Sequence, residues 1–324
     1  MANKNLTRAK REKNDEFYTR LSDIENELIH YRKHFKGKVI FLNCDDPYES
    51  NFWFYFHKQF EFLGLKKLIA THYVNGRKSF KFEYMGGDDN NIYSGIKIDL
   101  KGDGDFRSNE CVELLKESDI VVGNPPFSLF LNFINQLIKY DKNFIIIGNQ
   151  NAITYKDVFP LIKENRIWLG VNVKGMEFEV PNKSPYNTRS SFRIDKETGK
   201  FYQKLGNICW FTNLEHYKRN EELILWKLYN EKDNPKCDNY DAIEVSRVKE
   251  IPKDYYDVMG VPITFLNKYN PNQFEILGCT ESEGKGFSKG LWDKDSKVTQ
   301  PLIKGKRKYK RLFIRMLNRK LLLL

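Results

Sequence analysis

Apolar residues fall into two patterns along the chain: stripes with helical spacing and short uninterrupted runs. Behind a polar arm of 19 residues, Leu21, Ile24 and Leu28 begin a helical stripe, and a capping box at Ser22 predicts where this helix starts. Uninterrupted runs bounded by polar turns predict strands that are covered on both faces. The predicted strands span residues 38–43, 65–73, 96–100, 119–123, 143–148, 166–173 and 207–213. The predicted helices span residues 22–35, residues 50–63, a stretch after Ser108, residues 128–140 capped by Ser128, and residues 154–165 capped by Thr154.

The alternation of these elements predicts the fold class. Over about the first 215 residues, strands alternate with helices, which is typical of an α/β domain with a mostly parallel sheet and helices on both faces. In such sheets, ligands bind at the carboxyl ends of the strands. Residues 74–95 and 174–206 are polar and predict loops. The alternation fades near residue 215, so residues 1–215 predict one domain and residues 216–324 a smaller, irregular region.

The charge of the chain points to a polyanionic partner. The 324 residues carry a formal charge of +11, and residues 304–320 contain nine basic residues and no acidic one. Clustering of this kind favours a surface that contacts nucleic-acid phosphates over a simple codon bias toward lysine. The alternative for this segment is a solvated basic helix with Leu312 and Ile314 packed inward. The candidate phosphate contacts are Lys304, Lys306, Arg307, Lys308, Lys310 and Arg311.

The sequence also argues against several function classes. No apolar run approaches the roughly 18–20 residues of a membrane span, and no apolar segment follows the basic N-terminal arm, as it would in a secretory signal. The five cysteines lie far apart without a CxxC pair, which argues against disulfides and against a zinc site. The five histidines have no metal-binding spacing. We therefore expect a cytoplasmic protein that is not bound to a membrane and needs no metal.

The motif at residues 119–127 carries the clearest chemistry. A buried strand, Asp-Ile-Val-Val-Gly, runs directly into Asn124, Pro125, Pro126 and Phe127. Two consecutive prolines fix the backbone and remove two donors, so their carbonyls remain as rigid acceptors. The Asn124 side chain adds an acceptor, and Phe127 adds a flat aromatic face. Together they predict a site for a planar group with an amino substituent, such as a nucleobase; the alternative is an ordinary turn after a strand.

This motif resembles the catalytic motif of S-adenosylmethionine-dependent amino-methyltransferases, and its Asn form is similar to that of N6-adenine DNA methyltransferases. The layout of the first 215 residues resembles the EcoRI-type adenine-specific DNA methyltransferases of type II restriction–modification systems. The resemblance implies a Rossmann-like fold with a seven-stranded, mostly parallel sheet, S-adenosylmethionine as the cofactor, and a target-recognition region at the C-terminus. The matching stretches include DEFYT (15–19), NCDDP (43–47), LKGDGDFRS (100–108) and SDIVVGNPPFSLF (118–130).

The resemblance also implies cofactor contacts in three places. An N-terminal motif lies against the methionine part of the cofactor, a loop after the first strand begins the cofactor site, and an acidic-aromatic pair contacts the cofactor's adenine amine. In the loop, many relatives carry glycines where this chain has Glu49, Ser50 and Asn51, so close approach of the backbone to the cofactor is in question there. The implied cofactor-binding residues are Phe17, Tyr18, Thr19, Asp46, Pro47, Tyr48, Asp105 and Phe106.

The resemblance implies direct methyl transfer to adenine N6 in double-stranded DNA. In this reaction Asn124 and the Pro125 carbonyl accept hydrogen bonds from the two N–H groups of the amine, and Phe127 stacks on the base. An adenine inside a duplex has to be flipped out to reach such a site. Similarity to the EcoRI-type enzymes also suggests a GAATTC-like target and a monomer. Two alternatives stay open: an amino-methyltransferase acting on RNA or on a protein glutamine, and a non-catalytic DNA-binding protein on the same scaffold.

Overall fold

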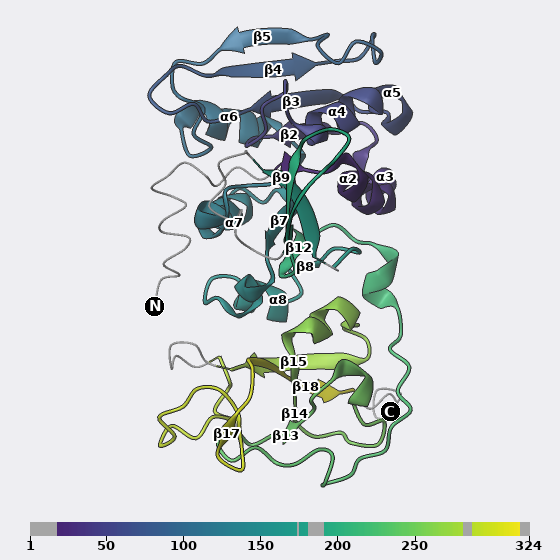
Figure 1. Ribbon diagram of the computed structural model, residues 1–324, viewed down its shortest axis with the longest axis vertical. Coiled ribbons are helices and arrows are strands. Elements are labelled where there is room, and N and C mark those ends of the chain that lie inside the picture. Colours follow the sequence, from purple (N-terminus) through teal and green to yellow (C-terminus); the bar gives the residue numbers. More distant parts are fainter. Residues whose placement is uncertain (1–17, 174, 181–190, 281–286, 318–324) are drawn as a thin grey trace. The chain divides into compact units, whose positions relative to one another are not determined.

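The computed structural model describes residues 18–173, 175–180, 191–280 and 287–317. Contacts divide the chain into two compact units (Figure 1). Unit 1 contains the residues up to Gln150 and Leu169–His216, and unit 2 contains Asn151–Trp168 and the residues from Tyr217 onward. Residues 151–168 therefore leave unit 1 and join the C-terminal part of the chain.

Unit 1 is built on a mixed sheet of eight strands in the order β5-β4-β3-β2-β6-β7-β12-β8. The pairs β2/β3, β2/β6 and β6/β7 are parallel, and β4, β5 and β12 run antiparallel to their neighbours. Our expectation of seven mostly parallel strands is corrected to eight strands in a mixed sheet with a four-stranded parallel centre. The strands are β2 (Val39–Leu42), β3 (Lys67–Thr71), β4 (Phe80–Tyr84), β5 (Ile96–Asp99), β6 (Ile120–Gly123), β7 (Asn143–Asn149), β8 (Trp168–Leu169) and β12 (Ile208–Thr212).

The additional strand has a physical explanation. Strand β4 comes from the polar stretch 74–95 that we predicted to be a loop. It pairs with β5, whose four residues are all exposed, at one edge of the sheet. Strand β4 lies between this edge strand and β3 and is only partly buried, so it lacks the uninterrupted apolar run that identifies the central strands.

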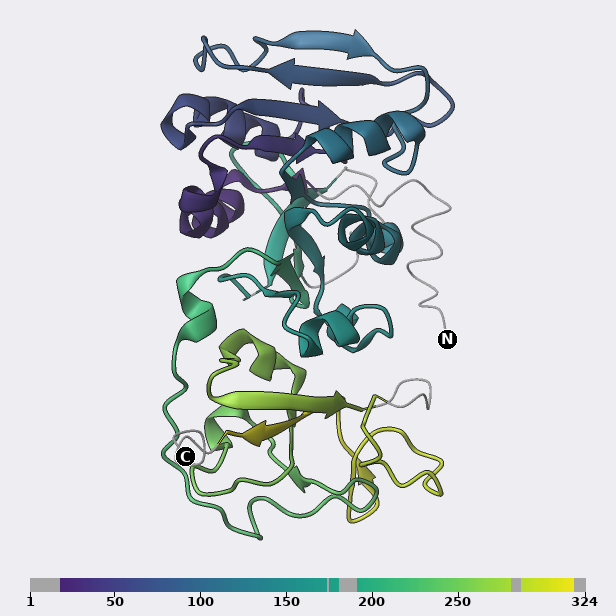
Figure 2. The same cartoon turned by 180° about the vertical axis from the view of Figure 1, so that it is seen from behind.

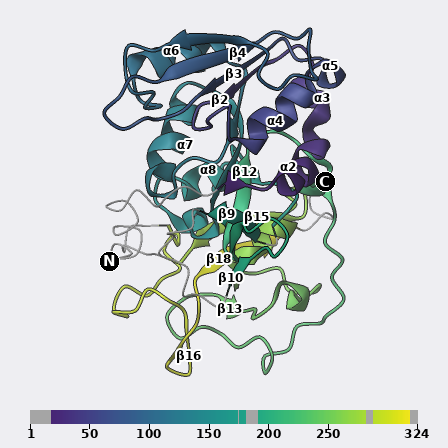
Figure 3. The ribbon, with the colours of Figure 1, turned by 45° about the horizontal axis from the view of Figure 1, so that its top comes forward.

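Helices cover both faces of the sheet of unit 1 (Figures 2 and 3). Helices α2 to α5 lie on one face, where their apolar side chains share a buried core with β2 and β3, and α6 and α7 lie on the other. The 3-10 turns η1 (Ile29–Tyr31) and η2 (Phe127–Leu129) precede α3 and α7. The helices are α2 (Leu21–Leu28), α3 (Arg32–Phe35), α4 (Asn51–Lys58), α5 (Phe60–Leu63), α6 (Asn109–Glu117) and α7 (Phe130–Lys139).

The predicted helix caps met different outcomes. Ser108 caps α6, and its hydroxyl accepts a hydrogen bond from the Cys111 N–H. The capping box at Ser22 is wrong, because α2 already begins at Leu21 after Arg20, whose side chain makes no cap hydrogen bond. The Ser128 cap is also wrong, since that residue lies inside η2 before α7 begins.

A smaller antiparallel sheet of unit 1 has the order β1-β9-β11-β10. It includes part of the polar stretch 174–206 that we predicted to be a loop. Strand β9 has alternating side chains, with Met176, Phe178 and Val180 buried, which is the pattern of a sheet with one covered face. Its strands are β1 (Tyr18–Thr19), β9 (Met176–Val180), β10 (Phe192–Ile194) and β11 (Phe201–Leu205).

Unit 2 contains a four-stranded sheet in the order β13-β14-β18-β15 and a two-stranded hairpin, β16/β17. Helix α8 (Phe159–Lys163) packs against β15, and the residues before it form a 3-10 turn, η3 (Gln150–Thr154), so the predicted cap at Thr154 is wrong. Three further 3-10 turns are η4 (Tyr217–Asn220), η5 (Val248–Glu250) and η6 (Ile263–Lys268). The strands are β13 (Ile243–Glu244), β14 (Met259–Pro262), β15 (Phe274–Cys279), β16 (Leu302–Ile303), β17 (Lys306–Arg307) and β18 (Arg311–Met316).

The basic segment is a hairpin and a core strand, and the alternative of a basic helix over residues 304–320 is wrong. Leu312, Phe313 and Ile314 are fully buried in β18, which lies between β14 and β15. Three apolar residues in succession suit a strand covered on both faces. The end of the segment, residues 318–320, lies outside the described residues.

Candidate active site

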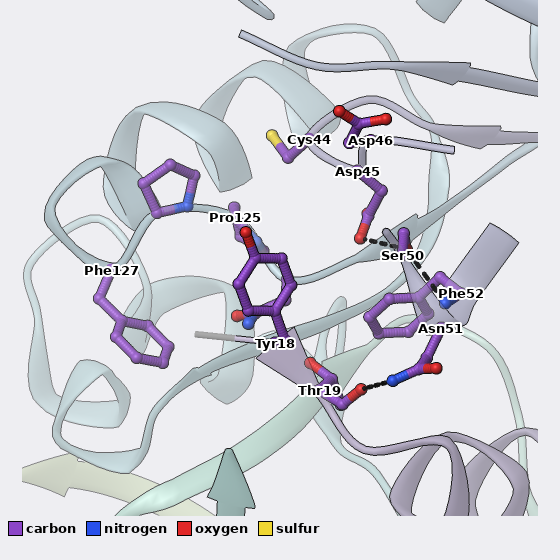
Figure 4. Close-up of a pocket in the computed structure, with 12 residues that line it drawn as sticks. Tyr18, Thr19, Cys44, Asp45, Asp46, Ser50, Asn51, Phe52, Pro125 and Phe127 are labelled. Atoms are coloured by element: carbon purple, nitrogen blue, oxygen red, sulfur yellow. Dashed lines mark hydrogen bonds between the residues drawn. The ribbon is translucent and has the colours of Figure 1, made fainter. Parts of the chain in front are cut away.

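The site is a cavity of about 130 Å³ at the carboxyl ends of β2 and β6 (Figure 4). These neighbouring strands connect onward in opposite directions, β2 to β3 and β6 to β7, which is where open α/β sheets form their ligand crevices. The loop after β2, the loop after β6 and strand β1 all contribute to its wall. The cavity is lined by Tyr18, Thr19, Cys44, Asp45, Asp46, Ser50, Asn51, Phe52, Asn124, Pro125, Pro126 and Phe127.

The loop after β6 presents acceptors and an aromatic ring. Among the described residues, no backbone N–H donates to the Pro125 carbonyl, whereas the Pro126 carbonyl accepts a hydrogen bond from the Leu129 N–H at 2.8 Å. The Pro126 carbonyl therefore belongs to the turn that leads into α7. Phe127 packs edge-on against the buried ring of Phe178, with 6.2 Å between the ring centroids and 84° between the ring planes.

The loop after β2 is held by Ser50, which has two roles. Its side chain caps α4 by accepting hydrogen bonds from the N–H groups of Phe52 and Trp53, and its hydroxyl donates to Asp45 Oδ1 at 2.8 Å. The other oxygen of Asp45, Oδ2, is buried and has no hydrogen-bond partner among the described residues. Burial raises the pKa of the Asp45 carboxyl to about 7, although the Ser50 hydrogen bond opposes the shift.

The residues that replace the expected glycines fasten the N-terminal strand to this loop. The Tyr18 hydroxyl donates to Glu49 Oε2 at 2.8 Å, and the Asn51 side chain donates to the Thr19 carbonyl at 2.8 Å. The hydroxyl oxygen of Thr19 is buried without a partner among the described residues. Figure 4 shows the Tyr18 and Thr19 side chains at the cavity together with Asn51.

The remaining predicted cofactor residues lie outside the cavity wall, or outside the described residues in the case of Phe17. Tyr48 is about half exposed and packs against Phe80, with ring centroids 5.7 Å apart. Asp105 is paired with the Arg107 guanidinium, which lowers the pKa of its carboxyl. Phe106 and Pro47 also do not line the cavity, and Phe106 is buried. Of the predicted cofactor residues, Tyr18, Thr19 and Asp46 line the same cavity as the loop after β6, and these four do not line it.

Sequence reasoning missed Asp45, Ser50 and Asn51 as wall residues. A serine just before the aromatic helix 51–58 was the available signal, because serine at that position is a common helix cap. The burial of Asp45 could not have been found in the same way, since its neighbour Asp46 has the same residue type and stays partly exposed.

The basic candidates of unit 2 differ in their exposure. Lys304, Lys306 and Arg307 are exposed, whereas Lys308 and Lys310 are half-buried. The Lys310 ammonium donates to the Thr154 hydroxyl at 3.0 Å. Arg311 is only 5% exposed, and its Nε donates to Glu244 Oε2 at 3.1 Å. The side chain of Arg311 is therefore directed into unit 2 and not toward an external partner.

The described residues contain no candidate metal site and no candidate membrane helix. Among them, no cluster of three or more His, Cys, Asp or Glu side chains could hold a metal ion. No helix in the described ranges is both long enough and apolar enough to cross a membrane.

Comparison with known proteins places the whole chain in one family. The family model described as "Adenine-specific methyltransferase EcoRI" matches residues 5–317. The chain is 48% identical to the type II methyltransferase M.EcoRI of Escherichia coli, over 97% of this chain and 96% of that protein. It is 42% identical to M.MgeORF184P of Mycoplasma genitalium (96% and 98% covered) and 44% identical to M.MpnI of Mycoplasma pneumoniae (85% of each). No solved structure gave a significant match.

These matches decide between the function classes that the sequence left open. They support a DNA methyltransferase of a restriction–modification system, and they do not favour the RNA, protein-glutamine or non-catalytic alternatives. The Asn-Pro-Pro-Phe loop and the strand that carries it lie within the matched region. The chain is an adenine-specific DNA methyltransferase and belongs to the EcoRI adenine-specific methyltransferase family.

Proposed function

We propose that this enzyme transfers the methyl group of S-adenosylmethionine to N6 of an adenine that is flipped out of double-stranded DNA. One observation carries the proposal: the loop of Asn124–Phe127 and the residues matched to the cofactor arm, Tyr18 and Thr19, line the same cavity. A methyl donor and a target amine have to meet at one point. This cavity has the proposed amine-binding loop, Asn124–Phe127, on its wall together with the proposed cofactor-binding residues Tyr18 and Thr19.

The chemistry of the cavity fits the cofactor. Asp45 and Thr19 line the cavity, and their buried Oδ2 and Oγ1 atoms have no hydrogen-bond partner within the described part of the chain. Buried oxygens of this kind are costly unless a ligand satisfies them. S-adenosylmethionine has an ammonium and a sulfonium group, and both are cations that a carboxylate stabilises. We therefore assign Asp45 and Thr19, with Tyr18 and Asp46, to the methionine part of the cofactor.

The chain supplies positioning and electrostatics for the reaction. When bound, S-adenosylmethionine would supply a methyl group on a sulfonium; the methyl–sulfur bond would break as the bond to N6 forms, S-adenosylhomocysteine would leave, and N6 would release one proton to water. The Asn124 side chain and the Pro125 carbonyl each accept a hydrogen bond from one N–H group of adenine N6. These two hydrogen bonds direct the nitrogen lone pair toward the cofactor side of the cavity. Phe127 stacks on the flipped base, with Phe178 behind it. Tyr48, Asp105 and Phe106 remain proposed contacts for the rest of the cofactor.

Unit 2 is the proposed DNA-recognition part, and unit 1 the catalytic part. The exposed basic residues of the β16/β17 hairpin, Lys304, Lys306 and Arg307, are the proposed phosphate contacts, with Lys308 beside them. We leave Arg311 out of this set because it is buried in an ion pair. The target is a GAATTC-like site, on which the enzyme acts as a monomer.

Sequencing that reports modified adenines tests the proposed function directly. DNA from cells that express the protein should carry N6-methyladenine at one sequence, and purified protein should transfer label from the cofactor to duplex DNA containing that sequence. Transfer RNA and release factors serve as alternative substrates in the same assay. Adenines that stay unmodified in the cells, or label that appears only in RNA or protein, would contradict the proposal.

The phosphate contacts predict a change in salt dependence. Lys306→Ala should weaken DNA binding to all sequences and reduce the slope of log K against log salt by about 1, because one fewer counterion is released. A single substitution is the right test, since deleting residues 304–320 would also remove the core strand β18. Lys236→Ala is the matched control, as Lys236 is exposed in the same unit but paired with Asp241. An unchanged slope for the Lys306 variant would refute the assignment.

Asp45 predicts a pH-dependent affinity for the cofactor. A bound cation favours the ionised carboxylate, so the pKa of Asp45, about 7 in the cofactor-free protein, should fall when S-adenosylmethionine binds. Binding then releases a proton below that pH, and the affinity should decrease as the pH is lowered from about 8 to about 6. Calorimetry across this range measures the effect. Asp45→Asn should bind more weakly and lose this pH dependence, and an affinity that rises at low pH would contradict the role of Asp45.

A further inference from the structure

The β16/β17 hairpin has a tight turn with a defined conformation. Lys304 and Gly305 have φ angles of +50° and +73°, and two successive positive φ values match the two-residue turn that suits the twist of a hairpin. The Gly305 N–H donates to Asp238 Oδ2 at 2.8 Å. The Leu302 N–H donates to the side-chain oxygen of Asn239, also at 2.8 Å. The hairpin is therefore fastened to the body of unit 2 at its turn and at its base.

The residues that follow the hairpin are held equally firmly. The Lys308 N–H donates to the Pro301 carbonyl at 2.8 Å. Arg311 Nη1 donates to the carbonyls of Tyr309 and Lys310 at 3.1 and 3.3 Å. The same guanidinium is locked in the buried pair with Glu244, so the backbone of residues 308–311 is fixed from inside unit 2.

On this fixed backbone, Tyr309 extends into solvent. Its side chain is 88% exposed, the largest exposure among the large hydrophobic and aromatic residues that the structure describes. In the sequence it lies between Lys308 and Lys310, and the exposed residues Lys306 and Arg307 precede Lys308. A single exposed aromatic residue is common on protein surfaces, but here a rigid backbone carries it within a basic segment. A positively charged surface with an aromatic ring is the combination that binds nucleic-acid backbone and base together.

We propose that Tyr309 stacks on a base of the bound DNA, at a base step that opens when the hairpin binds. The inference rests on the proposed function and adds a base contact to the phosphate contacts of the same hairpin. The anchored backbone reduces the entropy lost on binding, because the segment is already ordered. The neighbouring cations bind the phosphates, and the face of the Tyr309 ring then contacts the unstacked base. The phenol hydroxyl is not needed for this contact.

The experiment compares two substitutions at this position. The probe is a duplex built around the site that sequencing maps for the wild-type protein, with 2-aminopurine at one position of the site in each duplex to report which base step is unstacked. Tyr309→Ala should weaken binding roughly 5- to 150-fold, the range of one lost base–aromatic stack, with no change in the salt slope. Tyr309→Phe keeps the ring and should bind within about two-fold of the wild type. Tyr256→Ala, at an exposed tyrosine of the same unit beside Asp257, is the matched control and should bind normally.

The outcomes separate this inference from the proposed function. A Tyr309→Ala variant that binds like the wild type would overturn the stacking contact. So would a Tyr309→Phe variant as weak as Tyr309→Ala, since the hydroxyl and a phosphate would then be the contact. Both variants should unfold at the wild-type temperature, because the Tyr309 side chain is exposed. This result excludes a folding defect. A wild-type protein that neither binds nor methylates any duplex would overturn the proposed function itself, and this inference with it.

Discussion

Replacing Asn124 with alanine is expected to slow methyl transfer by about a hundred-fold to a thousand-fold, the cost of removing one positioned hydrogen-bonding group from a reacting centre. The alanine side chain cannot accept a hydrogen bond from the target amine, so the nitrogen lone pair is no longer directed at the methyl group. Cofactor affinity should change by only a few-fold, because Asn124 belongs to the loop after β6 and not to the wall formed by Thr19 and Asp45.

Single-turnover transfer of labelled methyl groups to duplex DNA measures the loss, and calorimetry with the cofactor measures binding separately. Asn90→Ala is a matched control at an exposed asparagine of unit 1 outside the cavity. Activity of the Asn124 variant within a few-fold of the wild type would show that the loop does not bind the target amine. Equal losses of activity and cofactor affinity would show that Asn124 acts on the cofactor instead.

Replacing Glu27 with alanine should destabilise unit 1 by about 2–6 kcal/mol, since each of the two buried donors left without an acceptor costs about 1–3 kcal/mol. Glu27 is fully buried, and its carboxylate accepts hydrogen bonds from the N–H groups of Val171 and Asn172 and from the Tyr31 hydroxyl. The Asn172 side chain also donates to this carboxylate, so the substitution removes the acceptor of four donors, and those of Val171 and Tyr31 belong to buried residues. With typical domain stabilities of 5–15 kcal/mol, a loss of this size removes a large part of the total.

Urea unfolding followed by circular dichroism measures this loss. The control is Glu25→Ala, an exposed residue on the same helix α2, which should change stability by less than about 0.5 kcal/mol. A loss below about 1 kcal/mol for the Glu27 variant would mean that water or a rearranged loop satisfies the donors that Glu27 leaves behind.

The central strands could be predicted because burial on both faces leaves a mark in the sequence. The runs VIFL of β2 and IVVG of β6 are apolar at every position, and each appears in the structure within the range that the sequence predicts. Strands β4 and β9 alternate in burial and lie among polar residues, so we interpreted their segments as loops. The alternation of apolar and polar residues in FKFEY and MEFEV was the local signal for these strands, and we did not use it.

The candidate site shows the same division. The loop of Asn124–Phe127 could be recognised because consecutive prolines after a buried strand have a direct chemical meaning. Asp45 could not, because its raised pKa comes from burial that only the folded chain creates. Arg311 was misplaced among the phosphate contacts for the same reason: its partner Glu244 is 67 residues away, and the run of basic letters gives no sign of it.

The path of the chain between its two units limits how this enzyme can diversify. The chain passes between the units three times, because residues 151–168 belong with the C-terminal part. Helix α8 in that segment packs its apolar side chains against β15, and Phe159 lies 5.7 Å from the ring of Phe287. A chimaera that exchanged only the residues after 216 would leave these apolar side chains without their own partners. An exchange that brings a new target sequence therefore has to include residues 151–168 together with the residues after 216. Otherwise the contact between α8 and β15 has to be kept, and only surface loops can change.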